Sequence, residues 1–181
     1  CVRRGLTAIP DYRAPIASVS ALEVLSVGRL IEKKGYFDQL AIYAALKARG
    51  ISFHASIVGE GPLHAALEGK IAELGLRGQV TLTGKLEYAQ VEALYAQANL
   101  FLFTGVVSAS GDRDGFPNVI GEAMAHSLPI FTTDVSGTTE GVPHRVRGIV
   151  IDLTNPQQTA AQILDVIRDA AELERLTRAA H

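Results

Sequence analysis

The chain has 181 residues, 48% of them hydrophobic and 20% charged, which is the composition of one ordinary globular domain and not of a disordered chain. Seventeen Lys and Arg stand against 19 Asp and Glu, and a formal net charge of -2 argues against a protein that binds nucleic acid mainly through its phosphates. The single cysteine, Cys1, excludes an intrachain disulfide and a thiolate metal cluster.

Residues 1–20 contain Pro10 and Pro15 and show no periodic pattern. We predict that they are a linker or the remnant of an N-terminal domain, and that residues 21–181 form one domain. The sequence has no apolar run long enough to cross a bilayer, and residues 1–15 lack the apolar core of a signal peptide. We therefore expect no membrane insertion and a cytoplasmic location.

From residue 21 onward, apolar strands alternate with amphipathic helices. Strands are predicted over 21–28, 51–59, 79–84, 99–105, 128–134 and 147–153. Helices are predicted over 36–50, 62–75, 88–98, 117–127 and from about 156 onward. The spacing in the first helix predicts a buried face of Phe37, Leu40, Ala41, Ala44 and Ala45. Apolar strands followed by helices favour a doubly wound, Rossmann-like parallel sheet in a three-layer α/β/α domain.

In such sheets the ligand binds beyond the carboxyl ends of the strands, near the point where the strand order reverses. The loops that follow strands span 28–35, 59–62, 84–87, 105–116 and 134–142. The first of them, "GRLIEKKG", contains Arg29 and Lys34. These cations could hold a diphosphate, Arg as a planar fork and Lys as a point charge. Two solvated loop charges are the alternative, and spacing alone leaves both interpretations open.

The second loop, "VGEGP" (58–62), connects a strand to a helix, which is where a dinucleotide fingerprint would stand. The G-x-G-x-x-G pattern fails because His64 stands at the third glycine, and no acidic residue ends the next strand. A dehydrogenase is therefore disfavoured. The turn still allows a ligand to approach the backbone at Gly59, or else it is simply a tight connection between strand and helix.

The stretch "DGFPNVIGEAMAHS" (114–127) predicts an anion site at the start of a helix. Pro117 suits the first helical turn, which places Gly115 and Phe116 at the amino end. Free N–H groups and the helix dipole attract anions there.

Two carboxylates belong to the same stretch. Glu122 lies one turn inside the helix among small apolar residues, an unusual setting for a surface glutamate, and its carboxylate suits the paired hydroxyls of a ribose. Asp114 could accept from the hydroxyls of a second sugar-like group. The alternative is that Asp114 only complements the helix dipole and that Glu122 faces solvent.

The motifs "VLSVGRLIEKKG", "IVGEGP", "LTG", "ALYAQANLFLFTG" and "DGFPNVIGEAMAHSLP" resemble the C-terminal, donor-binding domain of retaining group 1 (family 4) glycosyltransferases. The likeness covers about residues 20–170 in the expected order, and residues 111–125 are most similar to enzymes of exopolysaccharide, colanic-acid-type assembly. It implies the C-terminal half of a GT-B fold. It also implies transfer of a sugar from a nucleotide diphosphate sugar to an acceptor hydroxyl with retention, in polysaccharide or glycolipid synthesis.

The resemblance also assigns roles to residues. The family's G-R-x(4)-K-G loop and its E-x(7)-E pair imply catalytic roles for Arg29, Lys34 and Asp114, although Asp114 replaces the usual glutamate. Glu122 is expected to hold the ribose. The donor-binding residues implied in addition are Gly28, Gly59, Lys85, Leu86, Gly115, Phe116, Pro117, Asn118 and Val119, with Lys85 and Leu86 near the base. Glu140 is a candidate donor-side contact.

No metal and no cofactor are expected. Asp112-Arg113-Asp114 spells D-x-D, a metal-binding pattern of the other glycosyltransferase fold, but two carboxylates beside a helix start are poor evidence for a site. The expected partners are the nucleotide sugar and an N-terminal acceptor domain of the same protein, without which we expect little turnover. The resemblance allows the full-length protein to touch the inner membrane peripherally. A nucleotide-sugar epimerase half and a non-catalytic nucleotide-binding module remain as alternatives.

Overall fold

The computed structural model describes residues 9–15, 21–111, 115–135 and 137–181. Six parallel strands form one sheet in the order β3-β2-β1-β4-β5-β6, which confirms the doubly wound α/β prediction. The strands are β1 (Leu22–Val27), β2 (Phe53–Val58), β3 (Val80–Gly84), β4 (Leu100–Phe103), β5 (Ile130–Thr133) and β6 (Ile149–Ile151). The helices are η1 (Glu32–Lys34), α1 (Tyr36–Ala48), α2 (His64–Glu73), α3 (Tyr88–Gln97), α4 (Asn118–Ala125), α5 (Thr138–Gly141), α6 (Pro156–Arg168) and α7 (Ala170–Ala180).

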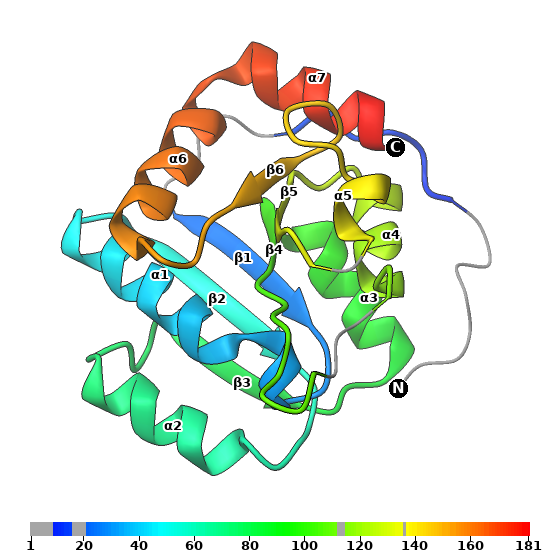
Figure 1. Ribbon diagram of the computed structural model, residues 1–181. Coiled ribbons are helices and arrows are strands. Elements are labelled where there is room, and N and C mark those ends of the chain that lie inside the picture. Colours follow the sequence, from blue (N-terminus) through cyan, green and yellow to red (C-terminus); the bar gives the residue numbers. More distant parts are fainter. Residues whose placement is uncertain (1–8, 16–20, 112–114, 136) are drawn as a thin grey trace.

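Helices cover both faces of the sheet (Figure 1). One apolar cluster joins the strands to α1, α2 and α6, and α1 lies alongside α6. The second cluster joins them to α3 and α4, around Tyr95, Phe101 and Ile120. Strands covered on both sides are shielded from solvent, and every residue of β4 and β5 is indeed buried.

The buried face of α1 differs from the one predicted. Phe37 is 41% exposed, and Ala41 and Ala44 are only partly buried. Leu40 and Ala45 are buried as predicted, and the core also receives Tyr36, Gln39, Ile42, Tyr43 and Leu46. The predicted and the observed faces are both consistent with the helical period. Gln39 and Tyr43 carry polar atoms, so their burial cannot be predicted without knowing which groups they bond to.

The C-terminal helical stretch is two helices and not one. The chain leaves the helical conformation at Asp169, whose carboxylate accepts hydrogen bonds from the N–H groups of Ala171 and Glu172 and so caps α7. The predicted loop 134–142 also contains the single turn of α5.

Two predicted helices begin at a proline or include one in the first turn, Pro62 in 62–75 and Pro117 in 117–127, and both prolines lie just before the observed helices. Pro62 precedes the N-cap of α2, and Pro117 is itself the N-cap of α4. Helix starts are commonly displaced by one or two residues in this way.

Part of the N-terminal stretch packs against the domain. The hydroxyl groups of Tyr12 and Thr177 are 2.9 Å apart, and the guanidinium of Arg178 lies 4.3 Å from the centre of the Tyr12 ring. Figure 1 shows this segment running beside α7. The division at residue 20 stays a prediction. Among the described helices, none has the length and apolar character needed to span a membrane.

Candidate functional site

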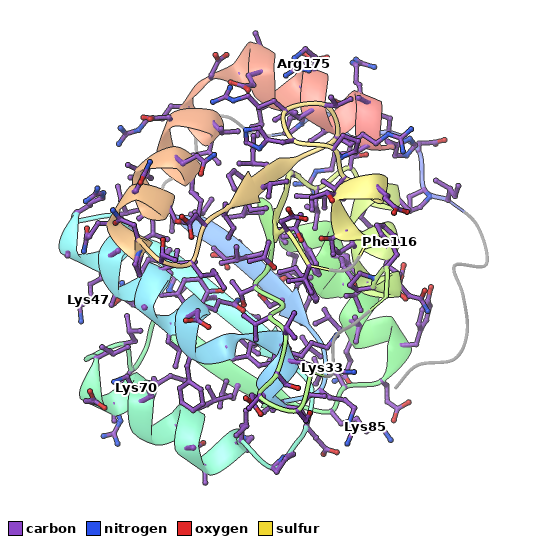
Figure 2. The ribbon with its side chains drawn as sticks, in the orientation of Figure 1. Lys33, Lys47, Lys70, Lys85, Phe116 and Arg175 are labelled. Atoms are coloured by element: carbon purple, nitrogen blue, oxygen red, sulfur yellow. The ribbon has the colours of Figure 1, made fainter. Side chains whose placement is uncertain are left out.

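A cavity of about 830 Å³ opens at the carboxyl ends of β1, β2 and β3. Strand order reverses between β1 and β4, so the cavity lies beside the switch point, where doubly wound sheets bind ligands. It is lined by Val27, Gly28, Arg29, Val58, Gly59, Glu60, Lys85, Leu86, Glu87, Tyr88, Val91, Tyr95, Asn118, Val119 and Glu122. Figure 2 shows Lys33 and Lys85 at this edge of the sheet, near the tip of β1.

The loop that carries Arg29 is supported on one side by the loop after β2. The N–H of Leu30 donates to the carbonyl of Glu60 at 2.9 Å, and the N–H of Leu63 donates to the carbonyl of Leu30 at 3.1 Å. A Cβ atom on Gly59 would lie 1.9 Å from the carbonyl oxygen of Gly28, and one on Gly61 would lie 2.3 Å from that of Leu30. The Gly-Glu-Gly turn therefore makes room for the protein's own backbone. Gly59 lines the cavity, but a neighbouring loop occupies the space that its missing side chain leaves.

The other end of loop 28–35 is held by the segment after β4. The Thr104 hydroxyl lies 3.1 Å from both the carbonyl of Lys34 and the side-chain oxygen of Gln39, and the N–H of Val106 donates to the carbonyl of Lys33 at 2.9 Å. Loop 28–35 thus bridges two strands and has a defined position before any ligand binds.

A buried polar network accounts for Gln39 and Tyr43. The Gln39 amide donates to the hydroxyls of Ser26 and Tyr43, and the Ser26 hydroxyl donates to the carbonyl of Leu102 at 2.7 Å. Burial raises the pKa of Tyr43 to about 12, so its hydroxyl stays protonated at neutral pH. Since buried polar groups stabilise a fold only when all are satisfied, this network fixes α1 and loop 28–35 against β1 and β4.

Replacement of Thr104 by valine tests how much the hydrogen bonds of its hydroxyl to Lys34 and Gln39 stabilise the fold. The side chain keeps its shape but loses the hydroxyl, so we expect the unfolding free energy to fall by about 0.5–1.5 kcal/mol. Urea unfolding followed by circular dichroism measures the change. The matched control is Thr81→Val, at an exposed position of β3. Equal effects of both variants would contradict a special role for Thr104.

The two predicted cations take different places. Arg29 is exposed and lines the cavity, and its guanidinium has no hydrogen bond or ion pair with any described residue. Lys34 does not belong to the cavity lining: its ammonium lies 5.1 Å from the centre of the Phe103 ring, at the end of β4. The structure therefore brings Arg29, and not Lys34, to the wall of the cavity.

The amino end of α4 forms the opposite wall. No side chain of a described residue caps this helix, and among the described residues the N–H of Ile120 is the first to be bonded, to the carbonyl of Pro117 at 3.0 Å. The N–H groups of Asn118 and Val119 have no acceptor among the described residues, and both residues line the cavity. N–H groups at a helix start attract anions, so the anion site predicted from the Gly-Phe-Pro turn would lie on this part of the wall.

The turn itself is positioned by α5. A Cβ atom on Gly141 would lie 2.1 Å from a ring carbon of Phe116, so the Phe116 ring rests directly on this glycine. Figure 2 shows Phe116 beside α4 and α5. Gly115, Phe116, Pro117 and Glu140 do not line the cavity. The contact between Phe116 and Gly141 could not be predicted from the sequence, because the two residues are 25 positions apart.

Glu122 lies on the cavity wall and not on an open surface. Its Oε2 accepts a hydrogen bond of 3.1 Å from the Tyr95 hydroxyl. Burial raises the pKa of Glu122; the Tyr95 hydrogen bond lowers it, nearby Glu92 raises it, and His126 lowers it. Tyr88, Val91 and Tyr95 also line the cavity, but the sequence does not mark them as site residues, because their helical spacing is also that of ordinary core residues.

Two further predictions concern Asp114 and metal binding. Asp112, Arg113 and Asp114 are not among the described residues, so the role of Asp114 stays a prediction. Within the described part of the chain, no group of three or more His, Cys, Asp or Glu side chains is arranged to hold a metal ion.

Comparisons with known proteins agree with this architecture. A family model described as "Glycosyl transferases group 1" matches residues 12–181. The amylovoran biosynthesis glycosyltransferase AmsK of Erwinia amylovora is 33% identical over 159 residues, covering 88% of this chain and 39% of the relative. The putative colanic acid biosynthesis glycosyltransferase WcaL of Escherichia coli K12 is 36% identical over 124 residues, covering 68% of this chain and 30% of the relative. The chain thus spans well under half the length of these relatives.

Solved structures share the fold. Anabaena Alr3699/HepE, crystallised with UDP and glucose, superposes with a TM-score of 0.75 at 24% identity, over 89% of this chain and 42% of the other. The C-terminal domain of a group 1 glycosyl transferase from Francisella tularensis gives 0.70 at 19% identity, over 88% and 82%. Taken with the match of the family model to nearly the whole chain, these findings show that the chain belongs to the group 1 glycosyl transferases.

Proposed function

We propose that this chain is the donor-binding domain of a retaining glycosyltransferase, which moves a sugar from a nucleotide diphosphate sugar to an acceptor hydroxyl in polysaccharide or glycolipid synthesis. One observation carries the proposal. A single cavity joins the Arg29 guanidinium, the carboxylate of Glu122 and the N–H groups at the start of α4, which have no acceptor among the described residues. The names of the relatives, which refer to amylovoran and colanic acid, support the polysaccharide assignment.

The cavity suits a diphosphate and a ribose together. Negative charge grows on the leaving diphosphate as the glycosidic bond breaks, and fixed donors aimed at that charge lower the barrier. Arg29 and the N–H groups of Asn118 and Val119 are such donors, since loop 28–35 and α4 are held in place by the protein itself. On this proposal no metal is required. Additional roles for Lys34 and Asp114 remain predictions.

The remaining walls suit the nucleoside. Glu122 would accept hydrogen bonds from the ribose hydroxyls, while Lys85, Leu86 and Tyr88 line the side of the cavity toward β3, where the base would lie. The acceptor site would come from an N-terminal domain of the full-length protein, as the greater length of the relatives suggests. UDP in the crystals of HepE supports a nucleoside diphosphate as the ligand.

Calorimetric titration with UDP, GDP and ADP tests the proposal. We expect one of the three to bind, and Arg29→Ala to weaken that binding by about 1–2 kcal/mol, roughly 5- to 30-fold, because an exposed charge-assisted bond is partly screened by water. The control is Arg77→Ala, an exposed arginine between α2 and β3 that does not line the cavity. Failure of all three nucleotides to bind would contradict the proposal.

A further inference from the structure

Tyr95 connects α3 to α4 inside the cavity wall. Its side chain is 1% exposed, and its hydroxyl lies 3.1 Å from Oε2 of Glu122 and 3.3 Å from the carbonyl oxygen of Val119. Both acceptors belong to α4. Because the hydroxyl has one proton, the two acceptors share it, and the carboxylate is the stronger acceptor.

The Tyr95 ring is held by aromatic contacts. It stacks on the His126 ring with centroids 5.0 Å apart and planes 8° apart, and on Phe101 with centroids 6.0 Å apart. His126 is in turn 3.3 Å from a carboxylate oxygen of Glu92, one turn before Tyr95 on α3. Two parallel links therefore join the helices, Glu92 to His126 and Tyr95 to Glu122. This arrangement leaves the Tyr95 hydroxyl little freedom to move.

The anchored oxygen restricts the whole carboxylate. With Oε2 held by Tyr95, rotation of the Glu122 carboxylate is limited, while Oε1 has no hydrogen bond to any described residue. Burial and the nearby Glu122 charge raise the pKa of Tyr95, so the phenol remains a donor at neutral pH. A preset acceptor loses less entropy when a ligand binds than a free side chain does.

We propose that Tyr95 is a positioning residue, whose hydroxyl fixes the Glu122 carboxylate in the orientation that recognises the paired 2′ and 3′ hydroxyls of the donor ribose. This inference rests on the proposed function, and it deepens that function by naming what sets the selectivity for a ribose diol. It requires Tyr95 to act only through Glu122, without touching the nucleotide's phosphates.

The test compares each nucleoside diphosphate with its 2′,3′-dideoxy form, by calorimetry on UDP, GDP and ADP. The wild-type chain should prefer the ribose form, and Tyr95→Phe should reduce that preference by about 2- to 10-fold, the effect of one hydrogen bond. Affinity for the dideoxy form should change by less than about 2-fold, because only the diol uses the anchored carboxylate. Tyr12→Phe is the matched control: it also removes a tyrosine hydroxyl with a hydrogen bond, but beside α7 and away from the cavity.

A double-mutant cycle shows whether Tyr95 acts through Glu122. In a Glu122→Gln background, Tyr95→Phe should no longer change the ratio between ribose and dideoxy forms. The inference is wrong if Tyr95→Phe keeps the full preference of the wild type for the ribose form. It is also wrong if Tyr95→Phe weakens the binding of the ribose and dideoxy forms equally. A continued effect in the Glu122→Gln background would also overturn it. If the wild type binds none of the three nucleotides, the proposed function itself fails, and the inference fails with it.

Discussion

Gly59→Ala is expected to lower the unfolding free energy by about 2–5 kcal/mol, as the sum of backbone strain and overpacking. Gly59 has a φ of 140°, which L side chains rarely adopt, and a Cβ atom there would lie 1.9 Å from the carbonyl oxygen of Gly28. The obstacle is backbone and not the end of a flexible side chain, so relief requires movement of the loop that carries Arg29. Nucleotide binding should weaken together with stability.

Gly69→Ala is the matched control. Gly69 lies inside α2, and its added methyl group would meet nothing within 4 Å, so alanine should raise stability by about 0.5–1 kcal/mol. Urea unfolding of both variants, read by circular dichroism, gives the comparison. A Gly59→Ala protein as stable as the wild type would show that the two loops separate at little cost, and that they do not hold Arg29 in place.

The sheet could be predicted from the sequence because its strands are apolar at nearly every position and are separated by helices. The errors arose where tertiary contacts override local pattern. Burial of Gln39 depends on partners from β1 and from the segment after β4, which lie far along the chain. The break between α6 and α7 had a local signal: Asp169 followed by Glu172 is typical of a helix start, but the helical period on either side concealed it.

The site could be predicted in part for a similar reason. Arg29, Asn118, Val119 and Glu122 follow strands or begin a helix, and the topology of a doubly wound sheet brings such positions to one edge. Tyr95 could not be found in this way. It has the helical spacing of a core residue, and only the placement of α4 beside α3 gives its hydroxyl a carboxylate to bind. The Lys34 ammonium lies over the Phe103 ring, and Lys34 is not among the residues that line the cavity with Arg29, although the loop motif had grouped the two cations together.

Glu122→Gln is expected to have opposite effects on binding and on stability. Loss of the charged acceptor should weaken nucleoside diphosphate binding by about 2–3 kcal/mol, because hydrogen bonds to a charged group are the stronger kind. Stability should rise at neutral pH. Burial raises the pKa of Glu122 in the folded state above its unfolded value, so ionisation of this carboxylate opposes folding.

The pH dependence follows from the same shift. As the pH falls through the folded-state pKa, wild-type Glu122 takes up a proton, and the stability difference between wild type and variant should shrink. Wild-type nucleotide affinity should decline over the same interval, whereas the affinity of Glu122→Gln should change less, since glutamine does not titrate. Thermal unfolding and calorimetry from pH 7 downward measure both, with Glu68→Gln, an exposed residue of α2, as control. A lower melting temperature for Glu122→Gln at pH 7 would mean that the hydrogen bond from Tyr95 outweighs the desolvation of the carboxylate. The ionised Glu122 would then stabilise the folded state, contrary to the prediction.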